Sequence, residues 1–279
     1  MRKKVLLLGS SGLAGRAINE ALREDYQVVP AAGHQTPEGG CCLPVEEPQR
    51  LLEVLEHENP EIVISTIRGD FRAQLRFHEV LADWLAEKDR QLLYMSTSNV
   101  FDGELSRPHT ESDPPAAESE YGIFKQKCEA MLNKKLGERL IVFRLASVWV
   151  AGCPRIRLLE EHSRSGKKHH TIHGDAVNVT LAGQIGEYAK FVLAHDLWGI
   201  FHVGTTDMVD YFEFEKMVCE ACHIAPPEFE IEEVPSQAYQ AVLPAREEIP
   251  TELQMTVAQV LEALAEGRQG AHAAGTGKE

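Results

Sequence analysis

A glycine-rich turn near the start of the chain constrains the fold more than any other feature of the sequence. Residues 5–8 form a continuous apolar run, which predicts a strand buried on both faces of a parallel sheet. The run 9–15, Gly-Ser-Ser-Gly-Leu-Ala-Gly, follows directly, and a helical pattern begins behind it. Glycines at these spacings permit a tight turn, the approach of a pyrophosphate to the backbone, and close packing of helix on strand. The turn therefore predicts a dinucleotide site at a helix N-terminus.

The rest of the chain alternates between strand-like and helical patterns. This alternation predicts an α/β fold with a Rossmann-type doubly wound parallel sheet and a strand order of 3-2-1-4-5-6. We expect residues 1–150 to form the nucleotide-binding domain, to which residues 183–204 return. Residues 151–182 and 205–266 are expected to build a smaller C-terminal substrate lobe. The small, polar segment 267–279 is predicted to be disordered.

Charge and composition exclude several classes of protein. The 279 residues carry a formal net charge of −15, which repels nucleic acid and anionic membrane surfaces. No stretch approaches the roughly 20 apolar residues of a membrane-spanning helix, and the N-terminal apolar run is too short for a secretory signal. We therefore expect a cytoplasmic protein with no nucleic-acid or membrane partner, whose six cysteines are reduced thiols.

A tyrosine and a lysine four residues apart, Tyr121 and Lys125, are the first candidates for catalysis. On a helix this spacing places both side chains on one face. A lysine cation close to a tyrosine favours the phenolate and lowers its pKa from about 10. Such a tyrosine can exchange a proton with a carbonyl or hydroxyl oxygen. Thr97 follows the strand-like run 91–95, and its hydroxyl is placed to bond the same oxygen.

The glycine turn, Thr97 at a strand end and the Tyr121/Lys125 pair, in this order, resemble the short-chain dehydrogenase/reductase superfamily. Its extended branch is more similar still. Residues 97–103 read Thr-Ser-Asn-Val-Phe-Asp-Gly, residues 108–115 match Pro-x-Thr-Glu-x-Asp-Pro-Pro, and Tyr-Gly-x-x-Lys follows. These runs resemble the dTDP-4-dehydrorhamnose reductase family and its sugar-nucleotide-modifying relatives.

The resemblance implies an NAD(P)-dependent oxidoreductase that reduces a nucleotide-linked 4-keto sugar. Tyr121 would protonate the forming alkoxide, and Thr97 would orient the carbonyl oxygen. Lys125 would lower the pKa of the tyrosine and bond the nicotinamide ribose. A homodimer is compatible with this interpretation.

The residues at the end of the second predicted strand bear on the choice of cofactor. An acid there would hold the ribose 2′-hydroxyl of NAD, but residues 31–34 read Ala-Ala-Gly-His. Arg16 and His34 are placed to face a 2′-phosphate, so NADP(H) is favoured over NAD(H). The candidate cofactor-binding set is Gly9, Ser11, Gly12, Leu13, Gly15, Arg16, His34, Thr66, Ile67, Tyr121 and Lys125.

Candidate substrate contacts come from loops and strand ends. Ligands of such folds bind beyond the carboxyl ends of the strands. By position or by resemblance, these contacts are Arg68, Asp70, Asn99, Ser147, Trp149 and Arg246. The chain has Ser98-Asn99 and Ser147-x-Trp149 where reductases of the resembled family have other residues, so the identity of the sugar stays open.

Two other roles fit the same fold. Some relatives are NADP-binding regulatory subunits, such as the β subunit of methionine adenosyltransferase, and they keep the tyrosine and the lysine. A sugar-nucleotide epimerase uses the same core. A dehydratase generally needs an acidic pair beside the Thr97 position, and Ser98-Asn99 argues against it.

Two further patterns resemble binding sites for haem or for a metal ion. Residues 219–223 have the Cys-x-x-Cys-His spacing of haem attachment, but their amphipathic surroundings favour buried helix cysteines. A basic stretch within residues 155–173 is either an attractant for a nucleotide diphosphate or a solvated loop. Its histidines, His169, His170 and His173, lack the cysteine or carboxylate cluster of a recognisable metal site, so no metal is expected.

Overall fold

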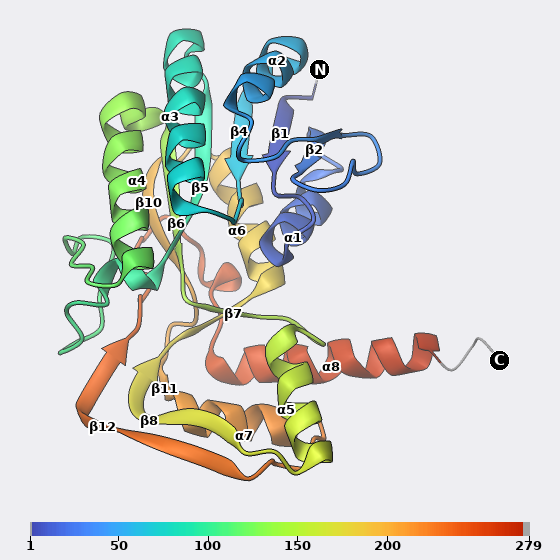
Figure 1. The fold of residues 1–279 in the computed structure, drawn as a ribbon, viewed down its shortest axis with the longest axis vertical. Helices are drawn as coiled ribbons and strands as arrows, with labels where there is room; N and C mark the ends of the chain where they lie inside the picture. Colours follow the sequence, from blue (N-terminus) through green and yellow to red (C-terminus); the bar gives the residue numbers. More distant parts are fainter. Residues whose placement is uncertain (1, 276–279) are drawn as a thin grey trace. The chain divides into compact units, whose positions relative to one another are not determined.

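The computed structural model describes residues 2–275, apart from the side chains of residues 235–236 and 269–275. Contacts divide the chain into two compact units (Figure 1). The first contains residues 1–103, 114–145 and 182–203, and the second contains residues 104–113, 146–181 and 204–279. Relative to the expected boundaries, the second unit begins near residue 146 and also takes in residues 104–113.

A seven-stranded parallel sheet forms the centre of the first unit. Its order is β10-β6-β5-β4-β1-β2-β3, so the predicted order 3-2-1-4-5-6 is confirmed and the returning strand β10 adds a seventh. The strands are β1 (Lys4–Leu8), β2 (Gln27–Ala32), β3 (Cys41–Cys42), β4 (Ile62–Ser65), β5 (Gln91–Thr97), β6 (Leu140–Leu145) and β10 (Gly199–Val203). The short strands β1 and β4 are almost wholly buried, which explains their continuous apolar sequences.

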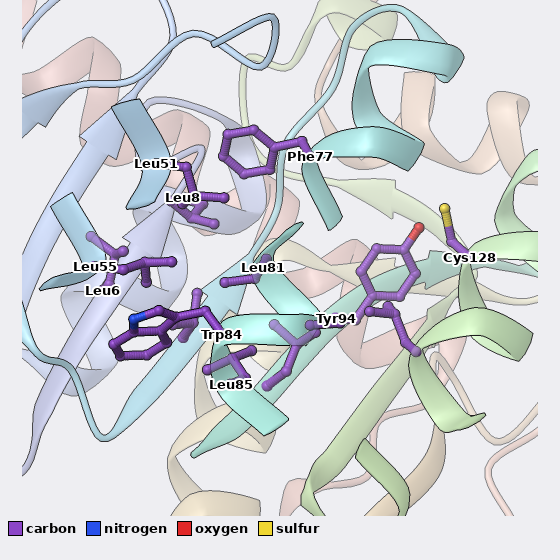
Figure 2. Close-up of a cluster of buried hydrophobic side chains, with 14 of the residues drawn as sticks. Leu6, Leu8, Leu51, Leu55, Phe77, Leu81, Trp84, Leu85, Tyr94 and Cys128 are labelled. Carbon is purple, nitrogen blue, oxygen red and sulfur yellow. The ribbon is translucent and has the colours of Figure 1, made fainter. Parts of the chain in front are cut away.

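Helices cover both faces of this sheet. On one face α1 (Leu13–Leu22) packs with α6 (Ala182–Ala194), while α3 (Phe71–Lys88) on the other face packs with α2 (Pro48–Glu58) and α4 (Glu120–Leu136). Alternate strand residues point to opposite faces. Leu6, Leu8 and Tyr94 therefore join the buried cluster under α2, α3 and α4, together with Phe77 and Leu81 (Figure 2).

The second unit is built around a three-stranded sheet. Its central strand β8 (His169–Val177) pairs antiparallel with β11 (Val209–Asp210) and parallel with β12 (Phe229–Gln240). A two-stranded sheet joins β7 (Ser147–Trp149) to β9 (Val179–Leu181). The helices of this unit are α5 (Pro154–Ser165), α7 (Tyr211–Ala221) and α8 (Val257–Gly275).

The C-terminal segment differs from the sequence expectation. α8 continues through residues 267–275, where disorder was predicted, because three alanines there favour helix despite three glycines. Residues 276–279 of that prediction lie outside the described residues. Within the described part of the chain, no helix has the length and apolar character needed to cross a membrane.

Candidate active site

The glycine turn and the end of β4 meet where the strand order reverses. Strands β2 and β3 lie on one side of β1 in the sheet, and β4 and β5 lie on the other side. Ligands of doubly wound sheets bind outside the carboxyl ends of the strands at such a point. Thr66 follows β4, and its hydroxyl donates to the carbonyl oxygens of Leu8 and Gly9 at 3.0 Å each. The predicted cofactor residue Thr66 therefore fixes the turn from the neighbouring strand.

At two positions of the turn, Gly9 and Gly15, a side chain would have no space. Gly9 has a φ of +82°, and a Cβ there would lie 2.6 Å from the Thr66 hydroxyl oxygen. A Cβ at Gly15 would lie 2.3 Å from the carbonyl oxygen of Gly9. α1 begins after Gly12 with no side-chain cap and no acidic residue in its first turn. Free N–H groups and the positive end of the helix dipole suit a pyrophosphate, so these residues fit a dinucleotide.

Thr97 ends β5, which lies next to β4 at the same edge of the sheet. Its hydroxyl donates to Asn99 Oδ1 at 3.0 Å and accepts from the Asn99 backbone N–H at 3.3 Å. The Thr97 side chain also lowers the pKa of Tyr121, which indicates that the two side chains lie close together. Thr97 and Tyr121 thus converge as predicted, and Asn99, expected to contact substrate, bonds Thr97.

Capping of α4 fixes the position of Tyr121. Ser119 is the N-cap of α4 and accepts from the backbone N–H of Gly122 at 3.0 Å. Asp102 holds this cap, because it accepts from the Ser119 hydroxyl and backbone N–H and from the Glu118 N–H. Its pKa is lowered, since these hydrogen bonds outweigh the effect of burial. The Asp-Gly and Tyr-Gly portions of the motif therefore place the tyrosine.

Lys125 lies one turn along α4 from Tyr121 and is buried. Its ammonium donates to the hydroxyl of Tyr94 at 3.1 Å and to the carbonyl oxygen of Met95 at 2.8 Å. The same nitrogen lies 6.0 Å from the centre of the Tyr121 ring. Burial lowers the pKa of Lys125 to about 8.

The expected lowering of the Tyr121 pKa by Lys125 is wrong for this arrangement. Tyr121 is 39% exposed, and its partial burial raises its pKa above 10, while Thr97 and the charge of Arg68 only partly oppose this effect. The physical reason is that the ammonium of Lys125 is directed to Tyr94 and Met95. A raised pKa keeps Tyr121 protonated at neutral pH, as a proton donor must be.

A buried ion pair that the sequence analysis did not predict connects α4, which carries Tyr121, to strands β5 and β6. Arg144 on β6 bonds the carboxylate of Glu129 at 2.7 and 3.2 Å. The hydroxyl of Ser96, beside Thr97, donates to the same carboxylate. Glu129 follows Lys125 by one helical turn. That spacing is visible in the sequence, but the partner on β6 is not.

The predicted substrate residues of the first unit have separate environments. Arg68 is exposed on the loop after β4, and its charge reaches Tyr121 and Lys125. Asp70 is the N-cap of α3, where its carboxylate accepts from the Ala73 N–H at 2.8 Å. This capping role accounts for Asp70 without a substrate.

The other substrate candidates, Ser147, Trp149 and Arg246, belong to the second unit. Trp149 is fully buried against Phe214, and its indole N–H donates to the Ser147 hydroxyl at 3.0 Å. Its prediction as a substrate contact is wrong, because a fully buried ring with a paired N–H is part of a core. Arg246 pairs with Glu248 at 2.7 Å.

Residues 108–113, part of the run that carried the family resemblance, belong to the second unit. Asp113 accepts from the Thr110 backbone N–H at 2.7 Å and pairs with Arg107 at 2.6 Å. These hydrogen bonds hold its pKa well below its usual range. Glu111 accepts from the Ala245 N–H at 3.0 Å. Glu111 and Asp113 therefore have structural roles in this part of the chain.

Two histidines of the basic stretch pair with glutamates of β12, at separations of 62 and 60 residues. His170 pairs with Glu232 at 3.1 Å, and His173 pairs with Glu233 at 2.7 Å. In the part of the chain that the structure describes, no group of three or more His, Cys, Asp or Glu side chains is arranged to hold a metal ion. Cys219 and Cys222, the two cysteines of the Cys-x-x-Cys-His spacing, are buried free thiols, as the helical pattern predicted.

Comparison with protein families decides the identity of the fold. The family described as "RmlD substrate binding domain" matches residues 2–265. The chain belongs to this family. The result confirms the resemblance to extended short-chain dehydrogenases/reductases, and with it the assignment of the chain as an oxidoreductase.

Individual relatives of this RmlD-family chain agree with the assignment. A probable dTDP-4,6-dihydroxy-2-methyloxan-3-one 4-ketoreductase from Streptomyces antibioticus is 24% identical over 230 residues, 76% of this chain and 75% of the relative. A dTDP-4-dehydrorhamnose reductase structure from Clostridium acetobutylicum superimposes with a TM-score of 0.81 at 18% identity, covering 95% and 99% of the two chains. A Bacillus anthracis dTDP-4-dehydrorhamnose reductase in complex with NADP gives a TM-score of 0.77 at 18% identity, covering 94% and 97%.

Proposed function

We propose that this RmlD-family chain is an NAD(P)-dependent reductase of a nucleotide-linked 4-keto sugar, with NADP(H) as the preferred cofactor. The observation that carries the proposal is the close approach of Thr97 and Tyr121, at the same sheet edge as a glycine cradle that suits a pyrophosphate. The relatives named above, which reduce dTDP-linked sugars by their names, supply the substrate class.

The side chains divide the chemistry between them. When bound, the nicotinamide supplies the hydride that converts the ketone carbon to an alcohol. Tyr121 then gives its hydroxyl proton to the alkoxide oxygen, and Thr97 donates a hydrogen bond that orients this oxygen. Arg68 adds positive charge near the tyrosine, which stabilises the phenolate left after proton transfer. Lys125 is proposed to bond the ribose of the nicotinamide.

The second unit is proposed to bind the sugar nucleotide. By the proposal, residues 151–182 and 205–266 supply the substrate lobe. Ser147, Arg246 and Asn99 remain proposed contacts, each already held by an internal hydrogen bond or ion pair. Substrate would have to exchange these partners for its own oxygens.

The test measures turnover of a panel of nucleotide-linked keto sugars, by the loss of absorbance of the reduced cofactor. The parent protein and Tyr121→Phe are compared. Loss of a general acid typically costs about 10²- to 10⁴-fold in rate. We expect the Phe variant to lose turnover on that scale while its cofactor affinity stays within about twofold. Equal turnover by the two proteins would remove Tyr121 as the acid. If the parent binds cofactor but reduces no sugar, the binding-subunit role replaces the reductase.

A further inference from the structure

The buried tyrosine of β5, Tyr94, contacts the ammonium of Lys125 although nothing in the motif points to it. Only 1% of Tyr94 is exposed, and its hydroxyl accepts a hydrogen bond from Lys125 Nζ at 3.1 Å. The lysine nitrogen also lies 4.6 Å from the centre of the Tyr94 ring, a distance at which a cation is attracted to the aromatic face. Tyr94 therefore contacts Lys125 through both its hydroxyl and its ring.

We propose that Tyr94 is a positioning residue for Lys125: its hydroxyl, with the Met95 carbonyl, fixes the ammonium on the sheet side of α4. The inference deepens the proposed reductase function, because Lys125 is one of the residues assigned to the reaction. Tyr94 touches neither the reacting atoms nor the glycine turn in the described contacts, so it acts through the lysine.

The surroundings of the ammonium explain why it needs this support. A buried cation is costly unless hydrogen bonds or opposite charges stabilise it. Arg68 on the loop after β4 opposes the charged lysine, while Glu129 and Cys128 on the same helix favour it. His78 on α3 is held neutral, with its pKa lowered to about 3 by burial and by the charge of Lys125. Tyr94 and Met95 thus supply the hydrogen bonds recorded for the ammonium.

The hydroxyl of Tyr94 is itself held in place. It points toward the thiol of Cys128 in Figure 2, and this thiol adds to the raising of the Tyr94 pKa. The ring packs edge-on to His78 with 5.0 Å between centroids. Burial raises the pKa of Tyr94 well above 10, so the hydroxyl stays neutral and keeps both a proton to donate and lone pairs to accept. Its orientation suits a bond accepted from Lys125 and a bond donated to Cys128.

The direct test is the titration of Lys125 in the cofactor-free protein. Lysine labelled with ¹³C at the ε position gives one NMR signal per residue, and Lys125→Met assigns the signal. Tyr94→Phe removes only the hydroxyl, so the charged lysine loses an acceptor and its pKa should fall by about one unit or more. Tyr188→Phe is the control, because it removes a buried hydroxyl on α6, over the other face of the sheet. It should leave the Lys125 signal unchanged.

A second variant keeps the test decisive if Tyr94→Phe does not fold. Replacing Tyr94 by 3-fluorotyrosine preserves the ring and weakens the hydroxyl as an acceptor, so the Lys125 midpoint should fall by a fraction of a unit. An unchanged or raised midpoint in either variant overturns the proposal. These titrations need no substrate, so they are independent of whether the protein proves to be a reductase.

A double-mutant cycle then links the contact to the site. Tyr94→Phe should weaken cofactor affinity and move the pH profile of turnover in the parent, and should do neither in the Lys125→Met background. Losses that add independently in the two backgrounds would show that Tyr94 matters for packing alone.

Discussion

The backbone carbonyl oxygen of Asn99 lies against Gly122, so closely that a Cβ on the glycine would be 2.2 Å from the oxygen. This contact joins the 3-10 helix η1 (Ser98–Phe101), which follows Thr97, to the first turn of α4, which carries Tyr121. The glycine beside the tyrosine is therefore required by packing, and the distance between Thr97 and Tyr121 depends on it.

Gly122→Ala should separate η1 from α4. Overpacking of this kind costs about 1–3 kcal/mol of the free energy of unfolding, and turnover should fall more than cofactor affinity because the Thr97–Tyr121 pair opens. Urea denaturation and steady-state kinetics measure the two effects. The control is Gly183→Ala in α6, where a Cβ meets nothing within 4 Å and helix propensity should add stability. Equal effects of the two variants would contradict the packing argument.

Lys125→Met should change how stability depends on pH. The folded-state pKa of Lys125 is lowered to about 8 from 10.5, so between these values the unfolded chain binds more protons and stability rises with pH. The contribution amounts to about 3 kcal/mol over this range. The stability of the Met variant relative to the parent should therefore fall from pH 8 to pH 10.5 and be constant below. Lys127→Met, an exposed lysine of the same helix, should show no such trend.

Glu129→Gln should be among the most damaging single substitutions in the first unit. It leaves the guanidinium of Arg144 buried without its counter-charge, and breaking such a pair costs about 3–5 kcal/mol. Glu20→Gln removes an exposed partner of Arg23 and should cost less than about 1 kcal/mol. Denaturant midpoints compare the two. A small loss for Glu129→Gln would mean that Arg144 is compensated elsewhere.

Thr97→Val should weaken, but not abolish, the reaction. It removes one neutral hydrogen bond to the reacting oxygen, which is worth roughly 0.5–1.5 kcal/mol, so turnover should fall by about threefold to tenfold. The Thr97 side chain also lowers the pKa of Tyr121, so its replacement should move the alkaline limb of the pH profile upward. A profile that moves downward would show that Thr97 does not bond Tyr121 in the working enzyme.

The preference for NADP(H) or NAD(H) tests the proposed roles of Arg16 and His34. Arg16 and His34 are exposed, and no acid stands at residues 31–34. NADP(H) should bind more tightly than NAD(H), and Arg16→Gln should reduce that preference by about tenfold through loss of a charge-assisted hydrogen bond. Arg23→Gln, beyond the end of the same helix, should leave the preference unchanged. Fluorescence titration with both cofactors measures it; equal affinities in the parent would end the proposal for NADP(H).

Local sequence predicted the frame of the site well. The glycine turn, the apolar strands and the helical spacing of Tyr121 and Lys125 are short-range patterns, because they reflect backbone conformation and side-chain period. Such patterns give the sheet, its order and the edge at which Thr97 lies. They also gave the family, since the motif residues that cap α4 and pack it on η1 are close together in the chain.

The tertiary structure alone decided which partner each side chain meets. Lys125 is directed to Tyr94, 31 residues earlier, and away from Tyr121 on its own helix. Trp149 is a core residue because Phe214 packs against it, and the charge of His173 is balanced by Glu233 at a separation of 60 residues. Burial and hydrogen-bond partners depend on segments that are distant in the chain. Burial and hydrogen bonds set the free-energy cost of each charged side chain, and this cost determines which groups of the site are protonated. No local sequence pattern contains this information.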